Sequence, residues 1–82
     1  MTAIDSKAAV KAAYDYLMQV SPTPSRFSNF RLEEINIDGQ KDYLVTLSYE
    51  EAGDFGFDKR KEYKDFKVGK DGTVVWMKIR KI

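Results

Sequence analysis

The stretch FRLEEINIDGQKDYLVTLSY, residues 30–49, decides the fold of this chain. Its second half alternates between two sets of side chains, and one of these sets is apolar or aromatic throughout: Tyr43, Val45, Leu47 and Tyr49. Side chains two residues apart on a β-strand share one face, so this period predicts a strand that is buried on one side. The Asp38-Gly39 pair that precedes it is a strong hairpin signal. The stretch therefore predicts an antiparallel hairpin.

The first strand of this hairpin changes its phase in the middle. Phe30 and Leu32 alternate in one phase, whereas Ile35 and Ile37 alternate in the other. A single strand over these residues needs one extra residue at Glu33-Glu34, which predicts a β-bulge there. With a three-residue loop, the expected pairs are Ile35 with Tyr43, Leu32 with Val45, and Phe30 with Leu47.

A second hairpin is predicted in the C-terminal part of the chain. Its strands run from about residue 61 to 68 and from 73 to 80, and the turn GKDG at 69–72 joins them. A four-residue loop pairs Phe66 with Val75 and keeps the inward side chains of both strands on one face. Residues 50–58, EEAGDFGFD, break the alternation with two glycines and are predicted to form a long loop or an irregular hairpin end.

The N-terminal residues 2–20 have the pattern of one amphipathic helix. They are rich in alanine, and apolar side chains recur at intervals of three and four residues: Val10, Ala13, Tyr14 and Leu17. Thr2, Asp5 or Ser6 can cap the helix, and Ser21-Pro22 ends it, because a residue before proline avoids the α region.

This element order predicts an α+β fold, with one N-terminal helix packed on a four-stranded antiparallel β-meander. A chain of 82 residues has room for one core, so we expect a single domain over residues 1–82. The core is expected to contain Val10, Ala13, Tyr14, Leu17, Phe30, Leu32, Ile35, Tyr43, Val45, Leu47, Phe66, Val75, Met77 and Ile79.

The residue types that are missing exclude several kinds of chemistry. The chain has no cysteine and no histidine, which excludes disulfides, thiol nucleophiles, Cys/His zinc sites and Ser-His-Asp triads. Adjacent carboxylates such as Glu33-Glu34 point to opposite faces of a strand and cannot flank one bond. We therefore expect a non-catalytic protein without cofactor or metal. No apolar run has signal-peptide or membrane-spanning length, which predicts a cytoplasmic protein without membrane contact, or an extracytoplasmic one if a leader was removed.

Charge is distributed unevenly along the chain. Residues 1–58 carry five basic and ten acidic side chains, whereas residues 59–82 carry nine basic and three acidic ones. A basic hairpin can attract nucleic acid, and the candidate contacts are Lys59, Arg60, Lys61, Lys67, Lys78 and Arg80. The alternative is that these cations are solvated and protect the sheet edge from aggregation.

One face of the predicted sheet should remain open, because a single helix cannot cover both faces. Aromatic and arginine side chains dominate the energy of protein interfaces. The candidate partner-binding residues are therefore Tyr63, Trp76, Lys78 and Arg80 on the sheet, together with Phe55 and Phe57 in the acidic loop. The predicted partner is a protein or peptide, or a second copy of the chain. Ordinary exposed aromatics and nucleic-acid binding are the alternatives, and Phe55 and Phe57 can instead close the core.

Several phrases of this sequence resemble PepSY-type domains. They are the helix SKAAVKAAYDYL with the proline that follows it, the first hairpin FRLEEINIDGQKDYLVTLSY, and the second hairpin YKDFKVGKDGTVVWMKIR. The element order is also similar to that of cystatins, although their inhibitory motif is not present. The PepSY resemblance implies a non-catalytic domain that binds or restrains other proteins, often peptidases, and usually outside the cytoplasm.

Overall fold

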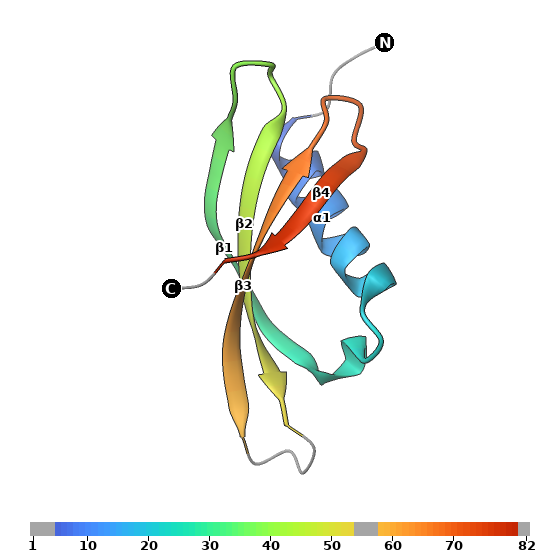
Figure 1. The fold of residues 1–82 in the computed structure, drawn as a ribbon, viewed down its shortest axis with the longest axis vertical. Helices are drawn as coiled ribbons and strands as arrows, with labels where there is room; N and C mark the ends of the chain where they lie inside the picture. The colour runs from blue at the N-terminus through green and yellow to red at the C-terminus, as the bar shows by residue number, and fades with distance from the viewer. Residues whose placement is uncertain (1–4, 54–57, 81–82) are drawn as a thin grey trace.

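The computed structural model describes residues 5–53 and 58–80. Its elements are α1 (Ser6–Val20), a short 3₁₀ turn (Pro24–Arg26), β1 (Phe27–Ile37), β2 (Tyr43–Ala52), β3 (Lys59–Val68) and β4 (Val74–Ile79). The strands form one antiparallel sheet in the order β1-β2-β3-β4, and α1 lies across one face of it (Figure 1). The predicted α+β fold, a helix on a four-stranded meander, is confirmed.

The helix α1 has a clear cap at each end. The Asp5 carboxylate accepts a hydrogen bond from the backbone N–H of Ala8 at 2.8 Å, so Asp5 is the N-cap among the three predicted candidates. At the other end, the N–H and the hydroxyl of Ser21 both donate to the carbonyl of Leu17. The buried stripe of α1 consists of Ala9, Ala13 and Leu17, and its two small alanines let the helix lie close to the sheet.

The β1–β2 hairpin contains the predicted bulge, but its predicted pairing is wrong. The register shifts between Leu32 and Glu34, which places the bulge at the expected point. The observed pairs are Ile35 with Val45 and Leu32 with Leu47, two residues away from the prediction. The turn is longer than three residues because the Asp38 carboxylate accepts hydrogen bonds from the N–H groups of Gln40 and Asp42. A shift of two residues keeps every side chain on its predicted face.

A second bulge in β1, which the pattern did not predict, builds an aromatic cluster. Asn29 has a positive φ of 55°, and the register shifts between Ser28 and Arg31. This places Phe30 beside Tyr49, with 5.5 Å between the ring centroids, while Phe27 contacts Tyr49 at 4.5 Å. Burial is the largest cause that raises the pKa of Tyr49 to about 12, and the charges of nearby carboxylates add to it.

The register of the β3–β4 hairpin also differs from the prediction. Phe66 lies opposite Met77, not Val75, and Val75 is the extra residue of a bulge between the pairs Lys67–Trp76 and Val68–Val74. The turn closes through the N–H of Gly69, which donates to the carbonyl of Thr73 at 2.7 Å. Val75 is 56% exposed as a result, so its predicted place in the core is wrong.

The core lies between α1 and the central strands. Its buried apolar side chains are Ala9, Ala13, Leu17, Val45, Leu47, Tyr49, Phe66 and Val68. Three further predicted core residues besides Val75 are exposed: Tyr14 at 37%, Leu32 at 48% and Ile79 at 63%. The helix lies mainly over β2, β3 and β4, and on the edge strand β1 the side chains of Leu32 and Ile37 remain exposed. We call the sheet face under α1 the inner face and the opposite face, which carries Leu44, Thr46, Asp65 and Trp76, the outer face.

Candidate interaction surfaces

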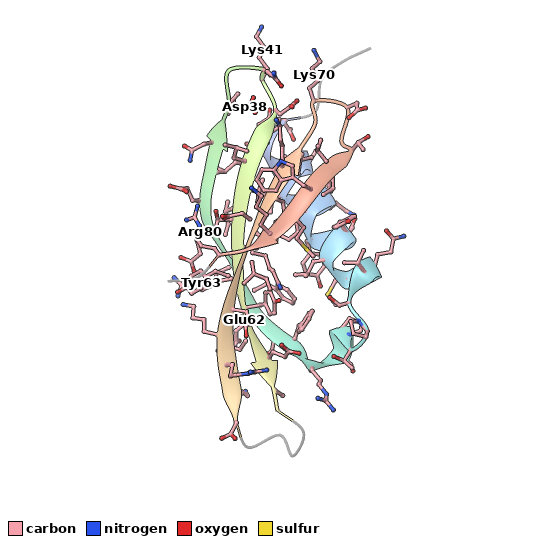
Figure 2. All side chains as sticks on the ribbon, in the orientation of Figure 1. Asp38, Lys41, Glu62, Tyr63, Lys70 and Arg80 are labelled. Carbon is pink, nitrogen blue, oxygen red and sulfur yellow. The ribbon has the colours of Figure 1, made fainter. Side chains whose placement is uncertain are left out.

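The outer face carries both sheet aromatics that the sequence singled out. Trp76 lies opposite Lys67, and Tyr63 lies opposite Ser48. Both rings are half-buried, so neither is sealed in the core. Four residues of β3 separate the level of Trp76 from that of Tyr63, or about 13 Å at the rise of a strand. The two aromatics are therefore separate contact points, and Figure 2 shows Tyr63 and Arg80 on the side of the sheet away from α1.

Arg80 links three strands across the outer face. Its Nε lies 2.9 Å from Asp65 Oδ2, and its Nη2 lies 3.6 Å from Glu34 Oε2 on β1. The other oxygen of Asp65 accepts a hydrogen bond from the hydroxyl of Thr46 at 2.6 Å. Thr46 is only 4% exposed although it points away from the core, because this network covers it. The Arg80 guanidinium, which was predicted to contact a partner, thus also holds strands of the sheet together.

Glu33 forms a second network on the outer face. Its carboxylate accepts a hydrogen bond from the buried hydroxyl of Ser48 at 2.5 Å, and Lys61 Nζ lies 3.9 Å away. The Ser48 hydrogen bond, followed by the charges of Lys61 and Arg31, lowers the pKa of Glu33 against an opposing contribution from desolvation. The bulge residue Glu33 is thus held by its neighbours on β2 and β3.

Lys67 is held at the tip of the β1–β2 hairpin. Its Nζ lies 3.3 Å from Asp38 Oδ2 and 3.7 Å from Asp42 Oδ2. The pKa of Asp38 is lowered, first by the backbone N–H of Asp42 and to a smaller extent by Gln40 and Lys67, against desolvation. Figure 2 places Asp38 and Lys41 at this end of the molecule, which is also the end that carries Lys70 of the other hairpin. Of the cations predicted to bind nucleic acid, Lys61, Lys67 and Arg80 therefore form ion pairs with carboxylates of the same chain.

A shallow hollow of about 300 Å³ opens beside Trp76. It is lined by Glu34, Asn36, Leu44, Val45, Thr46, Asp65, Phe66, Trp76 and Arg80. Lys78 Nζ lies over the indole at 4.6 Å from the ring centroid, and Lys61 lies over Tyr63 at 5.4 Å. The structure thus brings Trp76, Lys78 and Arg80 to one region, with an apolar wall and a polar rim.

Two predicted contact residues, Phe55 and Phe57, lie outside the described residues. The described residues on either side of them, Gly53 and Asp58, are joined by a hydrogen bond in which the N–H of Gly53 donates to the carbonyl of Asp58 at 2.6 Å. Within residues 5–53 and 58–80, no group of three or more acidic side chains is arranged to hold a metal ion. Among the same residues, no helix is long and apolar enough to cross a membrane.

The inner face has an apolar groove that the sequence analysis missed. It lies between α1 and β1, where Tyr14 and Leu32 are exposed. The signal that could have revealed it is the spacing of Ala9, Ala13 and Leu17, each four residues apart. This small-residue stripe is the buried side of the helix, which turns Tyr14 toward the edge of the sheet.

Comparisons of the chain with protein-family models, with curated proteins and with solved structures found no match. Function is therefore inferred below from the two surfaces, the outer face around Trp76 and the groove between α1 and β1.

Proposed function

We propose that this chain is a non-catalytic protein-interaction module that binds a partner protein through the outer face around Trp76. The observation that carries the proposal is the half-buried indole beside Leu44 on the face that α1 leaves uncovered. Tryptophan and arginine provide a large share of the binding energy in protein interfaces, especially where an apolar centre has a polar rim. Trp76, Leu44 and Arg80 have this arrangement.

The ion pairs of the outer face support this proposal because they fix the surface before a partner arrives. Arg80 is held by Asp65 and Glu34, and Lys78 lies over the Trp76 ring. Side chains that are already ordered lose less conformational entropy on binding. The PepSY resemblance adds a regulatory or inhibitory role and makes a peptidase the first class of partner to test.

Nucleic-acid binding is the weaker alternative. A nucleic-acid surface needs cations that are available to phosphates, and their number sets the salt dependence of binding. Lys61, Lys67 and Arg80 each lie near a carboxylate of the same chain, which offsets their positive potential. Lys59 and Arg60 are exposed at the start of β3 and are the remaining candidates.

The proposal is tested by affinity capture from a native lysate with the wild type and two matched variants on β4. Trp76→Ala removes the proposed contact, whereas Val75→Ala removes its exposed neighbour, an aliphatic side chain outside the hollow. We expect a partner that the wild type and Val75→Ala retain and that Trp76→Ala loses by at least about tenfold in affinity. A partner retained equally by all three, with circular dichroism showing folded protein, would contradict the proposal.

A salt series on the same partner separates the protein interface from the alternative. A protein interface centred on Trp76 predicts a shallow dependence of affinity on salt, and insensitivity to Lys59→Glu. Binding lost on nuclease treatment, with a steep salt slope and sensitivity to Lys59→Glu, would instead support nucleic-acid binding.

A further inference from the structure

The helix α1 is too narrow for the sheet that it covers. The outer strands of a four-stranded sheet are separated by about 14 Å, whereas a helix with its side chains is about 10 Å wide. The buried stripe of α1 packs on β2, β3 and β4. Over β1, the side chains of Leu32 and Ile37 remain 48% and 62% exposed. The inner face therefore has an exposed apolar strip along β1.

Between this exposed strip and α1 lies a groove with apolar walls. Two adjoining hollows of about 350 and 290 Å³ share Lys7, Val10 and Leu32. Val10 and Tyr14 of α1 form one wall, and Leu32 and Ile35 of β1 form the other. At one end Tyr14 meets Phe30 edge to face, with 4.8 Å between the ring centroids.

The charges that line the groove have one sign. Lys7 and Lys11 supply its charges from α1, Arg31 is a further lining residue whose charge also acts on Glu33 of the outer face, and the described lining residues include no carboxylate. The nearest acidic partner on the helix is Asp15, which binds Lys11 Nζ at 2.7 Å in an exposed pair. Exposed pairs of this kind are weak and exchange readily with a competing carboxylate. A ligand that complements the groove has an apolar face flanked by acidic groups.

The backbone of β1 decides between a strand and a helix as the ligand. An added strand needs a regular edge, but β1 has bulges on both sides of Leu32, at Asn29-Phe30 and at Glu33. A helix needs no backbone bonds from the sheet and packs by its side chains alone, in the same layer as α1. A second copy of this chain does not supply that helix, because α1 already buries its apolar stripe and carries Lys7 and Lys11 itself.

We propose that the groove between α1 and β1 binds an acidic amphipathic helix of a partner protein, which lies beside α1 along the β1 edge of the sheet. The apolar side of this helix contacts Val10, Leu32 and Ile35. Its flanking carboxylates face Lys7 and Lys11. This site is separate from the outer face and does not depend on the function proposed above.

The test uses a fluorescein-labelled peptide of about 18 residues, with leucines spaced three and four apart and glutamates on the flanks. Fluorescence anisotropy with the full 82-residue chain measures its affinity. We expect Leu32→Glu to weaken binding at least about tenfold and Lys7→Glu about threefold or more, because each places a negative charge in the groove. Both positions are exposed, and circular dichroism verifies that each variant is folded.

Three controls make the result decisive. Val75→Glu adds the same charge at an exposed position outside the groove, and Trp76→Ala removes the outer-face contact, so both should bind the peptide like the wild type. A peptide of the same composition in scrambled order should bind at least about tenfold more weakly. The proposal would be overturned if the scrambled peptide, or a peptide with lysines in place of the glutamates, bound the wild type as tightly as the original peptide. It would also be overturned if the Leu32→Glu variant bound the original peptide as tightly as the wild type does. Loss on Trp76→Ala alone would also overturn it and assign the peptide to the outer face.

Discussion

Phe66 and Asp65 are neighbours on β3, yet they belong to two differently built faces. Phe66 is fully buried under α1 and is surrounded by apolar side chains. Asp65 points the other way and is held by the Thr46 hydroxyl and the Arg80 guanidinium. The inner face is stabilised by packing and the outer face by hydrogen-bonded ion pairs. A small domain with one helix can thus keep an open sheet face ordered without an apolar cover.

The largest effect is expected from Phe66→Ala, which should lower the free energy of unfolding by about 3–5 kcal/mol. The cause is lost burial plus a cavity between α1 and the sheet. Urea unfolding measures the change. Phe66→Leu, with an expected loss of about 1 kcal/mol, keeps the comparison measurable if the alanine variant does not fold. A loss below about 1 kcal/mol for a folded alanine variant would show that the inner face is not the main source of stability.

Asp65→Asn is expected to cost about 1–2 kcal/mol, because the amide keeps the shape of the side chain but loses the charge that binds Arg80. In contrast to the effect of Phe66→Leu, this loss should shrink as salt is added, since screening already weakens the pair in the wild type. A double-mutant cycle with Arg80→Gln gives the coupling between the two side chains. A coupling of zero would show that the ion pair does not order the outer face.

The bulge at Asn29 gives the next smaller effect. Asn29→Ala should lower the free energy of unfolding by about 1 kcal/mol, because a positive φ is less favourable for alanine than for asparagine or glycine. The substitution also removes the hydrogen bond to Glu50. Asn29→Gly is the matched control, since it also removes that hydrogen bond but fits the backbone. If urea unfolding shows the glycine variant to be the less stable of the two, the bulge does not require the left-handed conformation.

The pH dependence separates the carboxylates of the outer face and of the β1–β2 hairpin tip from the inner packing. The pKa values of Glu33 and Asp38 are lower in the folded chain than their ordinary values. Their stabilising contribution is therefore present above the ordinary carboxyl pKa and is lost as the pH falls through the folded value. Glu33→Gln and Asp38→Asn should each flatten the decline in stability below about pH 5. An unchanged acid profile, measured by urea unfolding at several pH values, would contradict this assignment.

The sequence predicts the elements and the bulge at Glu33-Glu34 because these depend on local alternation of side chains. The register of both hairpins is not predicted, because the hydrogen bonds of Asp38 lengthen the first turn and a bulge at Val75 alters the second. The position of Trp76 on the open face is predicted correctly, because side chains alternate between the two faces of β4. The groove along β1 is missed, because the spacing of Ala9, Ala13 and Leu17 predicts which side of α1 is buried but not how far α1 is offset across the sheet.

The central claim is that Trp76 lies on an open face that a partner covers. The chain has one tryptophan, so its fluorescence reports on this position alone. Acrylamide quenching of the isolated chain and of its complex with the captured partner tests the claim directly. We predict an indole that acrylamide reaches in the isolated chain and that is shielded in the complex. An indole already protected in the isolated chain, or equally quenched in the complex, would contradict the claim.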